Sequence, residues 1–316
     1  MRRALRIGGR ALLGAAAVAL LAEVILRWGV GLGDPPLARF DAQTEYELVP
    51  GRVYHRWGNR IAIDARGMRG PERADAPPPG TVRALLIGDS VVYGTHLLDQ
   101  DEIIAARLAP LLEGNPRLAG CRAEALSMAV SSWGPPNQLA FLRRTGTLGA
   151  QAAAIVVSAH DLADVPQPAA DIMPYRLRAP ATAIGDAVEA VEERYARPMW
   201  ALRLPFDERV RIARGALEEM IARLKAGGLP VVLAYHPTTD ERVGESRPER
   251  ESFAAIAAAA GIGFLDLGAA IPVGAGGAAG EGYLDHIHPD AEGAARIAAA
   301  LSGPLAAALA PACAAP

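Results

Sequence analysis

The sequence predicts an α/β fold, a doubly wound parallel sheet with helices on both faces. Apolar runs with the length of buried parallel strands lie at 82–87, 124–129, 153–158, 230–235 and 262–266. Stretches of helical character lie between and after them, at 100–113, 136–147, 207–226, 248–260 and 290–310. Because strands alternate with helices, neighbouring strands are expected to run parallel. The 316 residues, 51% of them hydrophobic, are enough for one substantial core.

The chain begins with an arginine-rich end followed by an apolar stretch. The arginines are Arg2, Arg3, Arg6 and Arg10. The stretch, Ala11–Leu26, contains one charged residue, Glu23, and is long enough to span a bilayer only if Ile7–Gly9 join it. No small-x-small cleavage site follows, which favours a retained signal anchor (residues 1–28) over a cleaved signal peptide. The positive-inside rule then leaves the N-terminus in the cytoplasm and sends the chain after Trp28 across the membrane.

Residues 29–80 are expected to form a linker and an extended, β-rich lead-in. Gly29–Phe40 contains glycines and a Pro35-Pro36 pair, which is typical of a linker leading away from a membrane. Residues 41–80 have the pattern of short strands and turns, ending at a proline-rich break. The α/β domain is therefore expected to occupy 81–316.

Three polar residues stand where serine-ester chemistry could use them. Gly88-Asp89-Ser90 follows the first strand of the sheet, at the edge where open α/β sheets bind ligands. Near the end of the chain, Asp285 and His288 lie just ahead of a helix. A serine needs a histidine to accept its proton, and the histidine needs a carboxylate to orient it. Ser90, His288 and Asp285 could fill these roles, although Gly-Asp-Ser also occurs in ordinary turns and Asp-x-x-His in helix caps.

With these motifs the chain resembles the SGNH (GDSL-type) hydrolases, in particular their bacterial envelope-anchored members. Gly88-Asp89-Ser90 matches the first block of the family, and Asp285 and His288 match the last. Tyr46–Gly51 and Ile63–Gly70 resemble the lead-in of the anchored members, so the resemblance covers about residues 41 to 302. It implies a flavodoxin-like sheet and a serine esterase with Ser90 as nucleophile, His288 as general base and Asp285 as its orienting carboxylate.

The two middle blocks depart from the family pattern. The resemblance implies an oxyanion hole made by the serine N–H, a glycine N–H and an asparagine side chain. Ser132 stands at the glycine position and His160 at the asparagine position. A backbone N–H survives the first change, and a neutral imidazole still donates one hydrogen bond. The oxyanion hole is therefore either adapted or weakened, and His160 could instead be a hydrogen-bonded histidine at a strand end, with Asp161 as a helix cap.

The resemblance implies an esterase that acts on O-acyl groups, especially O-acetyl, of cell-surface or secreted polysaccharide. Its domain would lie in the periplasm or outside, anchored in a bacterial inner membrane. An O-acyltransferase, or a carbohydrate-binding or assembly protein with a decayed oxyanion hole, are the alternatives. Asp89 and His236 are expected near the substrate, His236 alternatively as a plain loop histidine. The proline-rich segment between His160 and Phe206, with a helix near 185–197, is expected to form a wall or lid over the cleft.

Other partners and cofactors find little support in the sequence. The net charge of −3 and the lack of a basic stripe with aromatic residues argue against nucleic-acid binding. His286 and His288 have no further histidine or cysteine cluster that would complete a metal site, so neither metal nor cofactor is expected. Cys121 and Cys313 fall at the edge of the sheet opposite Ser90, and a disulfide between them suits an oxidising compartment better than two free thiols.

Overall fold

A computed structural model of the chain describes residues 2–166, 176–195, 204–243, 247–271 and 282–314. It confirms the predicted α/β fold. Five strands form one parallel sheet in the order β6-β5-β7-β8-β9. The strands are β5 (Thr81–Gly88), β6 (Arg122–Ala129), β7 (Ala152–Val157), β8 (Val231–Tyr235) and β9 (Gly263–Asp266). All residues of β5 and β7 are buried, as expected for central strands covered on both faces.

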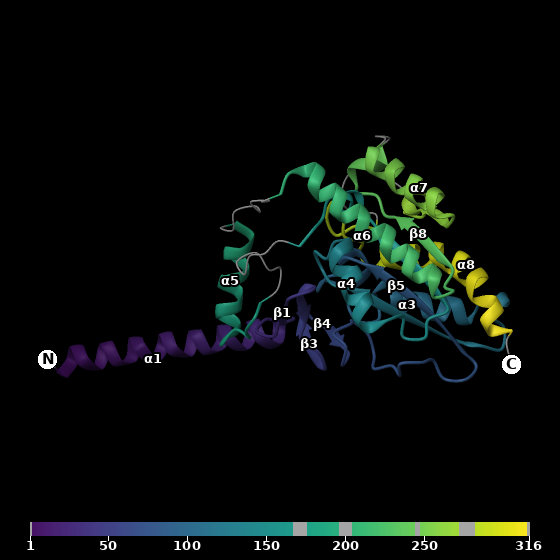
Figure 1. Cartoon of the computed structure of the whole chain (residues 1–316). Coiled ribbons are helices and arrows are strands. Elements are labelled where there is room, and N and C mark those ends of the chain that lie inside the picture. Colours follow the sequence, from purple (N-terminus) through teal and green to yellow (C-terminus); the bar gives the residue numbers. More distant parts are fainter. Residues whose placement is uncertain (1, 167–175, 196–203, 244–246, 272–281, 315–316) are drawn as a thin grey trace.

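Two groups of helices cover the sheet (Figure 1). In one group α3 (Ile104–Glu113) packs against α8 (Ala291–Cys313), and α8 also contacts β5 and β7. In the other, α4 (Pro135–Thr145), α6 (Phe206–Ala226) and α7 (Pro248–Ala260) pack in series. This arrangement leaves the carboxyl ends of the strands as a rim of loops, where the predicted site residues lie.

The N-terminal helix extends away from this domain (Figure 1). It comprises α1 (Arg2–Val24) and a π-helical segment, Ile25–Val30. Ile7–Val30 is long and apolar enough to cross a membrane, with a mean hydropathy of 1.9 and no buried part. Helix α8 passes the same test of length and composition, but 44% of it is buried, as for a core helix of the domain.

The lead-in contains the expected short strands, arranged as two antiparallel hairpins. The first pairs β1 (Ala38–Asp41) with β2 (Glu45–Leu48), and the second pairs β3 (Arg52–Arg56) with β4 (Asn59–Ile63). Within residues 29–40, the stretch expected to be a linker, Leu32 and Leu37 are buried in the protein.

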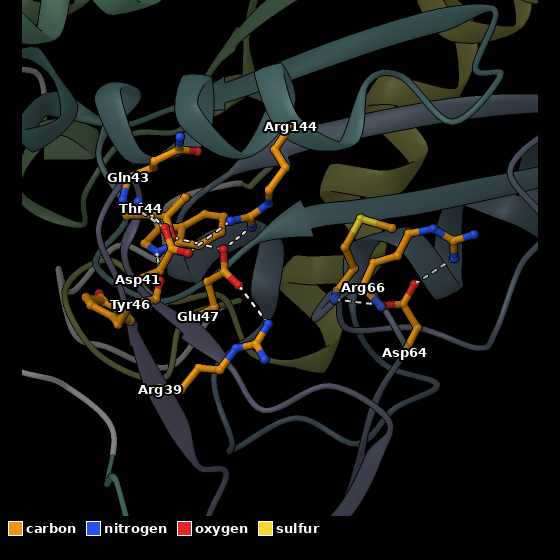
Figure 2. A network of polar contacts seen from close by, with 11 residues as sticks. Arg39, Asp41, Gln43, Thr44, Tyr46, Glu47, Asp64, Arg66 and Arg144 are labelled. Carbon is orange, nitrogen blue, oxygen red and sulfur yellow. Dashed lines mark hydrogen bonds and ion pairs between the residues drawn. The ribbon is translucent and has the colours of Figure 1, made fainter.

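A network of polar contacts joins the first hairpin to α4 (Figure 2). Glu47 is buried and accepts a hydrogen bond from the Thr44 hydroxyl. Arg39 of the same hairpin lies 3.3 Å from Glu47, and Arg144 of α4 pairs with Glu47 from the other side. The lead-in is thereby fixed against the helix that follows the predicted oxyanion residue Ser132.

Helix α5 (Ala183–Tyr195) lies away from the rim of the sheet. Its first backbone N–H groups, at Ala183 and Ile184, donate to Glu23 of α1 at 2.8 and 3.0 Å. The expectation that this helix covers the cleft is therefore wrong, because α5 contacts the N-terminal helix and, through Asp186, the lead-in residues Gly33 and Arg56. The other parts of the predicted wall, residues 167–175 and 196–203, lie outside the described residues.

Cys121 and Cys313 are joined by a disulfide, the pairing expected from the sequence. Cys121 precedes β6 and Cys313 ends α8, so the bond lies at the amino ends of the strands. Ser90 follows the carboxyl end of β5, at the opposite edge.

Candidate active site

Ser90 begins the short helix α2 (Ser90–Tyr93), directly after β5. Asp89 caps this helix by accepting a hydrogen bond from the Val91 N–H at 2.8 Å. Gly88 is required by close packing, because a Cβ there would lie 2.6 Å from Val92 Cγ2. The Gly-Asp-Ser motif thus makes a tight turn that presents the serine hydroxyl at the rim of the sheet.

The loop before α8 brings His288 and Asp285 to this serine. His288 Nε2 lies 2.8 Å from Ser90 Oγ, and His288 Nδ1 lies 2.7 Å from Asp285 Oδ2. The other oxygen of Asp285 accepts from the backbone N–H groups of Ile287 and His288 at 2.9 and 2.8 Å. Burial raises the pKa of Asp285, but the hydrogen bonds from His288 and Ile287 outweigh it and lower that pKa. The three predicted residues therefore form a hydrogen-bonded Asp-His-Ser relay.

His236 supports the loop that carries Asp285 and His288. Its side chain is fully buried, and Nε2 lies 2.8 Å from the carbonyl oxygen of Ile287. Burial lowers the pKa of His236 to about 4, so the neutral ring donates its Nε2–H to that carbonyl. The expected substrate contact of His236 is wrong, because the residue has no exposed surface.

Ser132 adopts the left-handed backbone conformation that normally favours glycine, with a φ of 60°. It lines the same cavity as Ser90 and His288. Two hydrogen bonds from the lead-in hold its neighbours: Tyr46 donates its hydroxyl to the Ser131 carbonyl at 2.6 Å, and Trp133 Nε1 donates to the Tyr46 carbonyl at 3.1 Å. The main chain at Ser132 thus keeps a glycine-like conformation although the residue carries a side chain.

The side chain of His160 forms an ion pair with Asp89. His160 Nε2 lies 3.0 Å from Asp89 Oδ2. Asp89 is only 1% exposed, which contradicts the expected substrate contact of this residue. The Nε2 atom of His160, placed by the family resemblance at an oxyanion-donor position, therefore has the Asp89 carboxylate as its partner.

Carboxyl groups surround His160 and control its charge. Burial lowers the pKa of His160, but the charge of Asp161 and the hydrogen bond and charge of Asp89 outweigh it and raise that pKa to about 10. Burial raises the pKa of Asp164 to about 6 and that of Asp161 well above its ordinary value. The raised pKa favours the charged imidazolium of His160 beside Asp89. Asp161 also caps the turn after β7, because its Oδ2 accepts from the Ser158 N–H at 2.7 Å.

The described residues contain one cluster of His, Asp, Glu or Cys side chains with the spacing of a metal site. Ligand atoms of Asp89, His160 and Asp161 lie within 4.8 Å of one another. In this structure the Nε2 atom of His160 pairs with Asp89 Oδ2 at 3.0 Å.

A cavity of about 740 Å³ opens over the relay. Ser90, Ser132, His160 and His288 lie on its walls. Further out, the walls carry charged side chains of both signs: Asp164, Arg209, Asp240, Arg247 and Glu249. Phe206 contributes an exposed aromatic side chain. The cavity thus combines a nucleophile with a polar surround.

The sequence did not reveal two residues that shape this site. Tyr46 lies in the lead-in segment that resembles the anchored members, but its contact with Ser131 joins two distant parts of the chain and is seen only in the fold. Asp164 follows Asp161 by three residues, a spacing that could have indicated two acids on one turn. Its carbonyl packs so closely on Gly134 that a Cβ there would lie 2.4 Å from it.

No protein-family model and no curated protein matches the chain. Solved structures that it resembles include a protein described as lipolytic and of the G-D-S-L family from Desulfitobacterium hafniense, with 14% identity, a TM-score of 0.43, and coverage of 70% of this chain and 98% of that one. TesA has 16% identity and a TM-score of 0.43, with 72% and 98% covered. The acetyl xylan esterase AlAXEase has 10% identity and a TM-score of 0.42, with 70% and 98% covered.

A protein of the G-D-S-L family and an esterase are thus among the structures similar to this one. Identities of 10–16% and TM-scores below 0.5 carry no argument about the reaction. The chemistry assigned to this chain rests on its own residues.

Proposed function

We propose that the chain is a serine hydrolase of the SGNH type that cleaves O-acyl esters. The observation that carries the proposal is the relay in which His288 bridges Ser90, at 2.8 Å, and Asp285, at 2.7 Å. This is the arrangement that a hydroxyl needs to become a nucleophile at neutral pH.

The reaction follows from the positions of these atoms. His288 Nε2 takes the proton of Ser90 Oγ as this oxygen attacks the ester carbonyl. The same proton then passes to the departing alcohol, which leaves an acyl group on Ser90. Water then attacks the acyl-enzyme carbonyl while His288 takes its proton, and His288 gives this proton to Ser90 Oγ as the bond to the acyl group breaks and the acid is released. Asp285 holds Nδ1–H throughout and stabilises the imidazolium.

For the oxyanion we assign the backbone N–H groups of Ser90 and Ser132. Ser90 is the first residue of α2, and Ser132 keeps the conformation of the glycine it replaces. His160 acts on the oxyanion site indirectly, because its contact is with Asp89, the residue that caps α2. In this assignment His160 is a positioning residue that keeps the serine turn in place.

The substrate assigned here is an acylated, in particular acetylated, polysaccharide of the cell surface or its surroundings. Charged side chains such as Arg209, Arg247 and Glu249 on the cavity walls suit a hydroxyl-rich alcohol better than a long acyl chain. The apolar N-terminal helix supports anchoring in a bacterial inner membrane, with residues 1–28 as tip and anchor, 29–80 as lead-in and 81–316 in the periplasm or outside.

A fluorophosphonate probe tests the nucleophile in the full chain solubilised in detergent. The probe is expected to modify the wild type, and modification should be lost in Ser90→Ala and His288→Ala. Ser302→Ala and His55→Ala are matched controls, because Ser302 lies in α8 and His55 in the lead-in, and both should label normally. A folded wild type that does not label would favour the carbohydrate-binding or assembly alternative.

Acetyl transfer is separated from hydrolysis by the fate of the acyl group. With an acetylated oligosaccharide as substrate, Ser90 should become acetylated. Hydrolysis of this acetyl-enzyme should then release free acetate into the water. If the acetyl group instead appears mainly on an added unacetylated oligosaccharide, the chain is an O-acyltransferase with the same relay.

A further inference from the structure

Glu23, the charged residue within the apolar N-terminal stretch, binds the start of α5. Its two carboxylate oxygens accept the N–H groups of Ala183 and Ile184, and Arg27 donates to it at 2.8 Å. The first N–H groups of a helix have no partner within the helix, so this carboxylate caps α5 from another part of the chain. The contact therefore fixes the level along α1 at which α5 lies.

A second, buried contact fixes the orientation of α5. Asp186 has no exposed surface and pairs with Arg56 of β3 and, at 2.6 Å, with Arg176. The Gly33 N–H donates to Asp186 as well, at 2.5 Å. Asp186 thus points into the protein, and Glu189, which is 52% exposed and lies 3.0 Å from the same Arg176, lies on the same side of the helix.

The apolar residues of α5 point the other way. Val188 and Val191 are 53% and 58% exposed, and they lie one turn apart on the same side of the helix. The π-helical segment that α5 contacts adds Ile25 and Trp28, which are 52% and 77% exposed. Helix α5 thus has acidic residues, Asp186 and Glu189, on one side and the exposed Val188 and Val191 on another, which is the pattern of an amphipathic helix.

The length of the anchor places this surface at the edge of a bilayer. A rise of about 1.5 Å per residue makes the hydrocarbon core, about 30 Å thick, end about 20 residues after Ile7, between Glu23 and Trp28. Tryptophan is favoured at that boundary. Figure 1 shows α5 running across the direction of α1, so that α5 lies along the membrane plane when α1 crosses it.

From this geometry we infer that α5 is a second membrane contact, which rests on the lipid surface with Val188 and Val191 in the interface. The inference depends on the proposed anchoring by α1. A single spanning helix leaves a domain free to tilt and rotate, whereas a second contact holds it in one orientation. The cavity over Ser90 would then face the same direction in every molecule, toward substrate presented at a fixed height above the lipid.

Spin labels at single introduced cysteines test the inference in vesicles of phosphatidylethanolamine and phosphatidylglycerol. The full chain, with its disulfide intact, would carry the label at Val188 or Val191. Labels at Val18, which is 68% exposed on α1, and at Glu113, which is exposed at the end of α3, are the controls. Relaxation by oxygen reports lipid, and relaxation by a water-soluble nickel chelate reports solvent. Each variant must unfold at the same temperature as the wild type, so that the test does not depend on the proposed activity.

The expected result is lipid-like relaxation at Val18, Val188 and Val191 and water-like relaxation at Glu113. Lipid-like relaxation at Val18 with water-like relaxation at both valines would overturn the second contact and leave the anchor standing. Water-like relaxation at Val18 would overturn the anchor, and the inference with it. Replacing the partner valine by glutamate in each labelled variant should shift the remaining label toward water, and no shift would also count against the inference.

Discussion

Replacing His160 by alanine tests whether this residue works through Asp89 or through the oxyanion. Asp89 is buried, and its contact with His160 spans 3.0 Å. Breaking a fully buried ion pair costs about 3–5 kcal/mol, whereas an exposed pair contributes about 0–1 kcal/mol. The His160 side chain is 42% exposed and that of Asp89 2%. We therefore expect a coupling free energy between the two of about 2 kcal/mol, about 30-fold in the folding equilibrium.

A double-mutant cycle measures this coupling. Urea unfolding of the detergent-solubilised full chain would be compared for the wild type, His160→Ala, Asp89→Asn and the double variant. Asp89→Asn is the matched change, because asparagine can still accept the Val91 N–H and cap α2. Additivity of the two changes within about 0.5 kcal/mol would refute the ion pair.

The same variants separate the two roles in catalysis. An oxyanion donor affects mainly kcat, by about two to three orders of magnitude, and its loss does not depend on Asp89. A positioning role predicts that Asp89→Asn and His160→Ala lower kcat by similar factors, and that the double variant is no slower than the slower single one. Fully multiplicative losses would return His160 to the oxyanion.

The pH dependence of stability tests the charge of His160 independently. His160 has a pKa of about 10 in the folded chain against an ordinary value of 6.5. A raised pKa contributes stability that is complete below pH 6.5 and is lost as the pH rises through about 10. The stability of the wild type relative to His160→Asn should therefore decrease between pH 7 and pH 10, and a constant difference would contradict the ionised state.

Two further predictions concern the supporting residues. Ser132→Gly should raise the free energy of unfolding by about 0.5–1 kcal/mol. The left-handed conformation costs a serine about 1–2 kcal/mol, and glycine loses about 0.5–1 kcal/mol in entropy on folding. Fluorophosphonate labelling should persist in this variant, and its loss would show that the serine side chain is needed. His236 has a pKa of about 4 in the folded chain, so it should destabilise the protein as the pH falls from 6.5 to 4, because the unfolded chain then binds the proton more readily. The Tm of His236→Gln should therefore fall less than that of the wild type between pH 7.5 and 5. An equal fall in Tm would count against the neutral ring.

The sheet could be predicted because its strands carry their own signal. A run such as Thr81–Gly88 is buried on both faces, so its apolar composition is set by its own position in the sheet. The placement of α5 could not be predicted. Helical periodicity identifies the segment, but its partner Glu23 lies far away in the chain and is selected only in the fold. The same holds for Leu32 and Leu37, which are buried in a stretch with the composition of a linker.

In the site, the identity of the residues could be predicted, but whether each side chain faces the cavity or is buried beneath it could not. Ser90, Asp285 and His288 belong to motifs that fix their spacing, and the structure brings them together. His236 ends a strand at the correct rim, but sequence alone does not distinguish a side chain that points into the cavity from one that points beneath it. Asp89 and His160 lie in two separate motifs, and their pairing depends on how β5 and β7 lie side by side.

The substitution of serine for glycine at 132 connects the lead-in to the reaction. A left-handed serine costs about 1–2 kcal/mol, which the turn must recover from its surroundings. Tyr46 and Trp133 supply two hydrogen bonds between β2 and this turn, each worth about 0.5–1.5 kcal/mol. The sum is large enough to hold the strained conformation, and with it the direction of the Ser132 N–H. The first hairpin is therefore part of the proposed oxyanion site, and the lead-in cannot be treated as a spacer that the α/β domain could lose without effect.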